Sequence, residues 1–130
     1  MSIRSVGDEA RLYFVPYILG NSRHSHKICA KIYKRFGIVS LICDERRSLL
    51  DLFDLSSRSI ELTETDSPRL VSEELIWLAT QNDYVLPILI PVSEKYQKMI
   101  ECERERLESC FVISSEQEIF TSSPLASLVK

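Results

Sequence analysis

Short apolar runs alternate with amphipathic helical periods along this sequence, and this alternation limits the fold more than any other feature. The runs typical of strands are YFVPYILG, IVSLICDE, RSIEL, PILIP and CFVIS. Helical periods occupy residues 22–37, 67–81 and 93–107, while RRSLLDLFDLSS predicts only a short helix or a turn. A chain in this order buries its apolar faces when its strands form a parallel sheet covered by helices on both sides.

The predicted helices carry recognisable end signals. Ser22 precedes the first helical period, and Gly37 follows it where a C-capping glycine belongs. Ser67 and Pro68 supply an N-cap and a proline at the first helical position of the second helix, and Ser93 caps the third. Short loops and right-handed crossovers between these elements favour the strand order 3-2-1-4-5. We therefore expect an α/β, Rossmann-like three-layer domain with a mostly parallel sheet of about five strands and helices on both faces.

Composition limits the domain organisation and the classes of partner. The 130 residues, of which 45% are apolar and 27% charged, suit one globular domain. We divide the chain into a polar leader at 1–12, the Rossmann-like domain at 13–115 and a tail at 116–130 without a strong period. The net charge of -3 gives no broad attraction for nucleic acid or membrane. Asp8 and Glu9 stand where a signal peptide would be apolar, so we expect a cytoplasmic protein.

Neither metal nor disulfide chemistry is indicated by the sequence. The cysteines are widely spaced and form no C-x-x-C pair, as is typical of reduced thiols: Cys29, Cys43, Cys102 and Cys110. His24 and His26 lie two residues apart at a predicted helix start. They point in different directions and cannot bind one metal ion from a regular helix, so we predict no metal site.

A ligand site is expected where the winding of the sheet reverses, beyond the carboxyl ends of the strands. In the order 3-2-1-4-5 that point lies between the first and fourth strands, and the loops GNSRHS and PVSEKY border it. The candidate substrate-binding residues are Gly20, Asn21, Ser22, His24, Ser93 and Glu94. Gly20 permits a sharp turn, and the helix start after it offers N–H groups to an anion. The alternative is structural: Ser22 only caps the helix, and His24 is solvated.

Motifs for nucleotide binding and catalysis are absent. The fingerprint G-x-G-x-x-G would need glycines where Ser22 and Ser25 stand, and no G-x-x-x-x-G-K-[ST] loop occurs. Asp44 ends the second strand, a position that often meets a ribose, and is a secondary candidate for cofactor binding. No nucleophile motif accompanies a Ser/His/Asp or Cys/His set. We assign no catalytic residue and expect this chain to bind no cofactor by itself.

The block PILIPVSEKYQKMIECERERLES resembles the end of the N-terminal, or pre-ATP-grasp, domain of ATP-grasp carboxylate–amine ligases. In that family a strand ends in I-P-[TV]-[SG]-[DE]-x-[YF], a pattern that residues 90–96 match. YILGNSRHSHKICAKIYKRFGIVSLICDERR is similar to the first strand, helix and second strand of the same domain, above all in the D-aspartate ligase-like branch. LSSRSIEL fits the segment that leads into the third strand, so the resemblance covers residues 13–115.

The resemblance implies a division of labour. In such ligases the N-terminal domain helps to bind the carboxylate or amino acceptor substrate. Later domains bind ATP and Mg²⁺ and form an acylphosphate that an amine then attacks. The implied cleft residues are Gly20, Asn21, Ser22 and His24 on one side, with Ser93 and Glu94 opposite. The implied partners are an amino acid or other small carboxylate and the ATP-grasp domains, which this sequence lacks. We expect the chain alone to be an inactive fragment or shortened relative.

A second hypothesis is a stand-alone Rossmann-like module that binds a small ligand or another protein. It would form a homodimer whose exposed apolar surface replaces the missing domains. A third, a nucleotide-sugar or dinucleotide enzyme domain, is disfavoured because the glycine fingerprint is missing. The first two hypotheses differ in whether ligand binding depends on domains outside this sequence.

Overall fold

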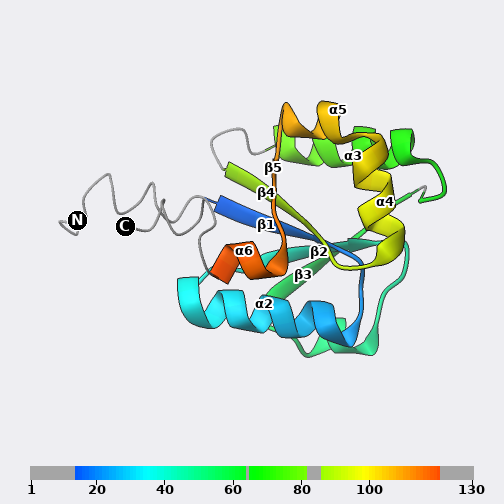
Figure 1. The fold of residues 1–130 in the computed structure, drawn as a ribbon. Coiled ribbons are helices and arrows are strands. Elements are labelled where there is room, and N and C mark those ends of the chain that lie inside the picture. The colour runs from blue at the N-terminus through cyan, green and yellow to red at the C-terminus, as the bar shows by residue number, and fades with distance from the viewer. Residues whose placement is uncertain (1–13, 64, 82–85, 121–130) are drawn as a thin grey trace.

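The computed structural model describes residues 14–63, 65–81 and 86–120. Its elements in chain order are β1 (Phe14–Leu19), α2 (Arg23–Phe36), β2 (Ser40–Asp44), η1 (Leu49–Leu52), β3 (Ser57–Glu61), α3 (Pro68–Thr80), β4 (Leu86–Pro91), α4 (Glu94–Cys102), α5 (Arg104–Glu108), β5 (Val112–Ile113) and α6 (Glu116–Phe120). The strands form one five-stranded parallel sheet in the order β3-β2-β1-β4-β5 (Figure 1). The predicted fold class and strand order are therefore confirmed, while the leader at 1–12 lies outside the described residues.

The register of the sheet brings three strand ends to one rim. Leu19 at the end of β1 lies opposite Cys43 on β2 and Pro91 on β4. The loops that follow β1, β2 and β4 consequently leave the sheet side by side. This is the edge at which the sequence predicts a ligand site.

Two apolar cores hold the helices to opposite faces of the sheet (Figure 1). One core joins Tyr17 and Leu19 of β1 to buried side chains of α3, α4 and α5. The other core joins Ile18 of β1 to α2 and α6. Because successive side chains of a strand point to opposite faces, the nearly continuous apolar run in β1 serves both cores.

The helix end signals read from the sequence act as expected. Ser22 has extended backbone angles, and its hydroxyl accepts the N–H of Ser25 at the start of α2. Gly37 ends that helix at φ 71°, and its N–H donates to the carbonyl of Tyr33. Ser67 caps α3 and is followed by a proline in the first turn. These local signals fix where the helices begin and end.

The helix predicted over 93–107 is divided in two, which corrects the sequence expectation. Glu103 ends α4 with φ -118° and ψ 21°, and α5 begins at the next residue. The Glu103 carboxylate accepts hydrogen bonds from Ser72 on α3 and from Arg106. A tertiary contact therefore accompanies the break. Leu107 is nevertheless buried beside α3, as the helical period predicts.

The end of the described chain forms an additional short helix that the weak period of the tail did not indicate. In α6, Ile119 is buried in the core beneath α2, and Phe120 stacks on Phe36 with ring centroids 6.4 Å apart. Arg35 also donates to the Phe120 carbonyl. Helix α6 is thus packed into the same core as α2.

None of the helices in the described ranges is long and apolar enough to cross a membrane.

Candidate functional site

The turns after β1 and β4 lie against each other at the rim. The N–H of Gly20 donates to the Cys43 carbonyl, and the N–H of Val92 donates to the Leu19 carbonyl, both at 3.0 Å. Gly20 has φ 116°, and a Cβ placed on it would come 2.9 Å from Cγ2 of Val92. Only glycine suits both the backbone angle and the close approach. The expected convergence of the two loops is therefore present.

The two serines among the candidate residues cap helices. The Ser22 hydroxyl accepts from Ser25 N–H, and the Ser93 hydroxyl accepts from Tyr96 N–H at 3.3 Å. Glu94, on the first turn of α4, is highly exposed and pairs with Lys98 at 3.4 Å. The structural role foreseen for these positions is thus observed. Their contact with a ligand stays a prediction.

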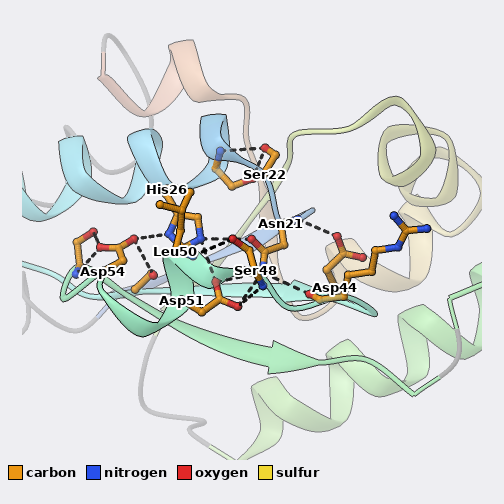
Figure 2. Close-up of polar contacts among 12 residues, drawn as sticks. Asn21, Ser22, His26, Asp44, Ser48, Leu50, Asp51 and Asp54 are labelled. Atoms are coloured by element: carbon orange, nitrogen blue, oxygen red, sulfur yellow. Dashed lines mark hydrogen bonds and ion pairs between the residues drawn. The ribbon is translucent and has the colours of Figure 1, made fainter.

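Asn21 and Asp44 bind each other across the ends of β1 and β2, as Figure 2 shows. The N–H of Asn21 donates to Oδ2 of Asp44 at 2.8 Å, and its side-chain amide donates to Asp51 and to the Arg46 carbonyl. The Tyr96 hydroxyl of α4 donates to Oδ1 of Asp44 at 2.8 Å. Asp44 therefore joins β1, β2 and α4. Hydrogen bonds within the protein already use both of its carboxylate oxygens.

His24 contacts α6, while more than half of its side chain stays exposed to solvent. Its Nε2 lies 2.8 Å from Oε1 of Glu116, whose other oxygen lies 3.9 Å from Lys31. Beside this contact is a pocket of about 300 Å³, lined by His24, Pro91, Val92, Gln97 and residues 115–117. We call it the rim pocket. It lies near the carboxyl ends of β4 and β5. Of the candidate residues, His24 lines it and the other five do not.

A buried cluster that sequence reasoning missed lies beside the rim (Figure 2). His26 places Nδ1 2.5 Å from Oδ2 of Asp54 and Nε2 2.9 Å from Oδ1 of Asp51, and Nε2 also lies 3.2 Å from Oδ1 of Asn21. We call these four residues the His26 cluster. Carboxylates only accept hydrogen bonds, so both ring nitrogens donate at once only when the imidazole is protonated. The cluster joins the start of α2 to the segment around η1.

Both carboxylates of the cluster are held ionised by their surroundings. Burial raises the pKa of Asp54, but hydrogen bonds from Ser56, His26 and Ser57 outweigh it and bring the pKa to about 2. Burial likewise opposes ionisation of Asp51, while the Ser48 N–H and other donors lower its pKa overall. The sequence did carry one signal of this arrangement. Acids interrupt the apolar segment LLDLFDL at a spacing of three, which puts both on one side of a tight turn.

The side chains at the rim are poor candidates for nucleophiles. Burial raises the pKa of the Tyr96 phenol, and its hydrogen bond to Asp44 raises it further. Burial also raises the pKa of the Cys43 thiol. Both groups are therefore neutral at ordinary pH. Within the ranges that the structure describes, no three His, Cys, Asp or Glu side chains form a group able to hold a metal ion.

The fold and rim define the class of this protein as a Rossmann-like α/β domain. No family model, curated protein or solved structure matches the chain. These comparisons therefore assign the chain to no family.

Proposed function

We propose that this chain is the N-terminal, substrate-binding and structural domain of an ATP-dependent carboxylate–amine ligase of the cytoplasm. The observation that carries the proposal is the packing of the Gly20 turn against Val92 and Ser93. That contact makes the turn after β1 and the family-like block after β4 two walls of one rim. In this proposal the chain supplies one side of a substrate cleft, and domains outside this sequence supply ATP, Mg²⁺ and the acylphosphate chemistry.

The rim pocket has a composition suited to an amino acid. The Gln97 amide and the His24 ring can donate to a carboxylate. Glu116, also in the lining, can accept from an ammonium group or hydroxyl. A pocket of about 300 Å³ is at the lower end of the range for small-molecule sites. We therefore place the substrate at this pocket, with His24 binding its carboxylate and Asp44 holding the rim in shape.

The direct test uses the complete reading frame that encodes this chain. The expressed protein should release phosphate from ATP only when a suitable carboxylate and amine are both present. His24→Ala should raise the KM for the carboxylate substrate and leave the KM for ATP unchanged. Glu101→Ala, at an exposed position on α4 outside the rim pocket and outside the candidate residues, is the control. A reading frame without an ATP-binding domain, or a protein without ATP-dependent turnover, would refute the ligase proposal.

A second candidate function, a stand-alone binding module, is favoured by a separate observation. Four large apolar side chains near η1 are between 75% and 89% exposed: Leu49, Leu52, Phe53 and Leu55. Exposed apolar clusters of this kind are typical of interaction surfaces. Calorimetry with nucleotides and amino acids separates the two functions, because an independent module should bind its ligand with full affinity in the absence of ATP and further domains.

A further inference from the structure

The segment around η1 has its polar and apolar side chains reversed relative to an ordinary surface turn. Asp51 and Asp54 point inward and contact His26. The large apolar side chains of the same segment point to solvent, and we call them the apolar ridge: Leu49, Leu52, Phe53 and Leu55. Surface segments normally place acids outward and leucines inward. The ridge therefore exposes apolar area that a partner could bury.

Hydrogen bonds fix the ridge in this orientation. Ser48 and Asp51 form a reciprocal capping box at the start of η1. Asp54 accepts from Ser56 and Ser57 as well as contacting His26. Turning the apolar side chains inward would break these bonds and leave the buried His26 ring without its carboxylate partners. The ridge is thus preformed, which lowers the entropy cost of binding.

The space beside the ridge is one that a helix would fill in a regular doubly wound sheet. Right-handed crossovers in the same direction place their helices on the same face, so the β2–β3 connection runs on the α2 face. The helical part of that connection, residues 45–56, is limited to the four residues of η1. Between α2 and η1 lies a hollow of about 260 Å³. Its lining consists of Arg23, His26, Lys27, Leu50, Phe53 and Asp54. The Asp54 carboxylate is already bound by His26, Ser56 and Ser57, whereas Arg23 and Lys27 have no such partner among the described residues.

Positive charge borders the hollow. Helix α2, RHSHKICAKIYKRF, contains no acidic residue. Arg23 and Lys27 line the hollow, and Arg46 lies just before η1. Among the residues that the structure describes, no ion pair to these three cations is found. An apolar ligand with acidic flanks would complement this border.

We propose that the apolar ridge and the adjoining hollow are a docking site for an acidic amphipathic helix of a partner protein. The helix lies beside α2, inserts its apolar stripe between Leu50 and Phe53, and turns its carboxylates toward Arg23 and Lys27. A second copy fits less well, since a twofold contact would bring the cations of two hollows together while Asp54, the acid in the lining, is already bound by His26, Ser56 and Ser57. A flat bilayer would contact the ridge and leave the hollow unfilled, whereas a helix covers the ridge and fills the hollow. This inference does not depend on the ligase proposal.

The test is a titration of the whole chain with a synthetic helical peptide of about 18 residues. The peptide carries leucine at i, i+3, i+4 and i+7 and glutamate beside that stripe. Backbone amide NMR shifts are expected around residues 23–27 and 49–55. A peptide with lysine in place of glutamate should bind at least about tenfold more weakly.

Substitutions in the ridge test whether the peptide binds there. Leu52→Ser with Phe53→Ser, both at exposed positions, should weaken binding at least about tenfold, whereas Trp77→Ser, at an exposed position on α3, should not. The proposal is overturned if millimolar peptide causes no shift or shifts residues elsewhere. Ridge-dependent dimerisation in sedimentation, or ridge-dependent binding to phosphatidylserine vesicles in place of the peptide, would overturn it too.

Discussion

Gly20 lies so close to Val92 that a methyl group on the glycine would come 2.9 Å from the valine Cγ2. Gly20→Ala should therefore destabilise the fold by about 2–4 kcal/mol, combining strain at φ 116° with overpacking. Gly37→Ala is the matched control, because its φ is also positive at 71° but no atom lies within 4 Å of the added Cβ. That variant should cost about 1–2 kcal/mol. Urea denaturation followed by circular dichroism measures both, and equal losses would contradict the close packing of the rim.

The two histidines at the start of α2 should respond differently to removal. His26 is nearly buried between two carboxylates, so His26→Ala removes one partner from each and leaves a cavity, and should cost about 3 kcal/mol. His24 is 58% exposed at its side chain, and His24→Ala should cost less than about 1 kcal/mol despite losing the Glu116 contact. Urea unfolding of the two variants measures both losses of stability. If the two variants lost similar stability, the His26 cluster would not hold the η1 segment.

The sequence was sufficient for the parts of the fold that local signals determine. The apolar periods and the positions of glycine and proline predicted the strands and the strand order. The capping serines Ser22, Ser67 and Ser93 predicted where three of the helices begin. The strands and helix starts depend on residues close together in the chain, and the strand order follows from them by the rule of right-handed crossovers. The convergence of the turns at Gly20 and Pro91 then followed from the topology of a parallel sheet.

The His26 cluster could not be predicted from the sequence, because it joins residues that are far apart in the chain through an irregular segment. His26 meets Asp51 and Asp54 only after η1 folds back beside α2, and no regular period describes that path. The break at Glu103 was hidden for a related reason. No glycine or proline marks it, and the contact with Ser72 comes from another helix. Helix α6 is too short to produce a recognisable period.

The decrease in the free energy of unfolding at acidic pH should depend on Asp54. Its pKa in the folded protein is about 2, below the ordinary value of 3.8, so its ionised form stabilises the fold. That contribution is complete above the unfolded pKa and is lost as pH falls through the folded pKa. The free energy of unfolding should therefore decrease from about pH 4 to pH 2. Asp54→Asn should be less stable at pH 7 and show a shallower decrease, measured by urea titrations across this range. An unchanged slope would exclude Asp54 as the group responsible.

The Tyr96–Asp44 contact should contribute measurably to the rim. Tyr96→Phe removes the hydroxyl donor at 2.8 Å and leaves Asp44 its bonds from the Asn21 and Glu45 N–H groups. Because the carboxylate keeps two donors, the loss should be about 1–2 kcal/mol rather than that of an unpaired charge. Tyr33→Phe, at a half-exposed position on α2, should be near neutral. A neutral Tyr96→Phe would show that this bond does not stabilise the contact between α4 and β2.

Cys102, Cys29 and Cys43 should react with a thiol reagent in an order set by their burial. Cys102 is exposed on α4, whereas Cys29 and Cys43 are buried in the two cores. Burial also raises the pKa of Cys29 to about 12 and raises that of Cys43, so neither offers a thiolate at pH 8. Iodoacetamide should therefore modify Cys102 of the native chain first and reach Cys29 and Cys43 only in denaturant, as peptide mass spectrometry would show. Cys102→Ser should abolish this fastest labelling. Early modification of Cys43 would mean that the sheet opens at β2 and that the rim is not the rigid edge on which the proposed site depends.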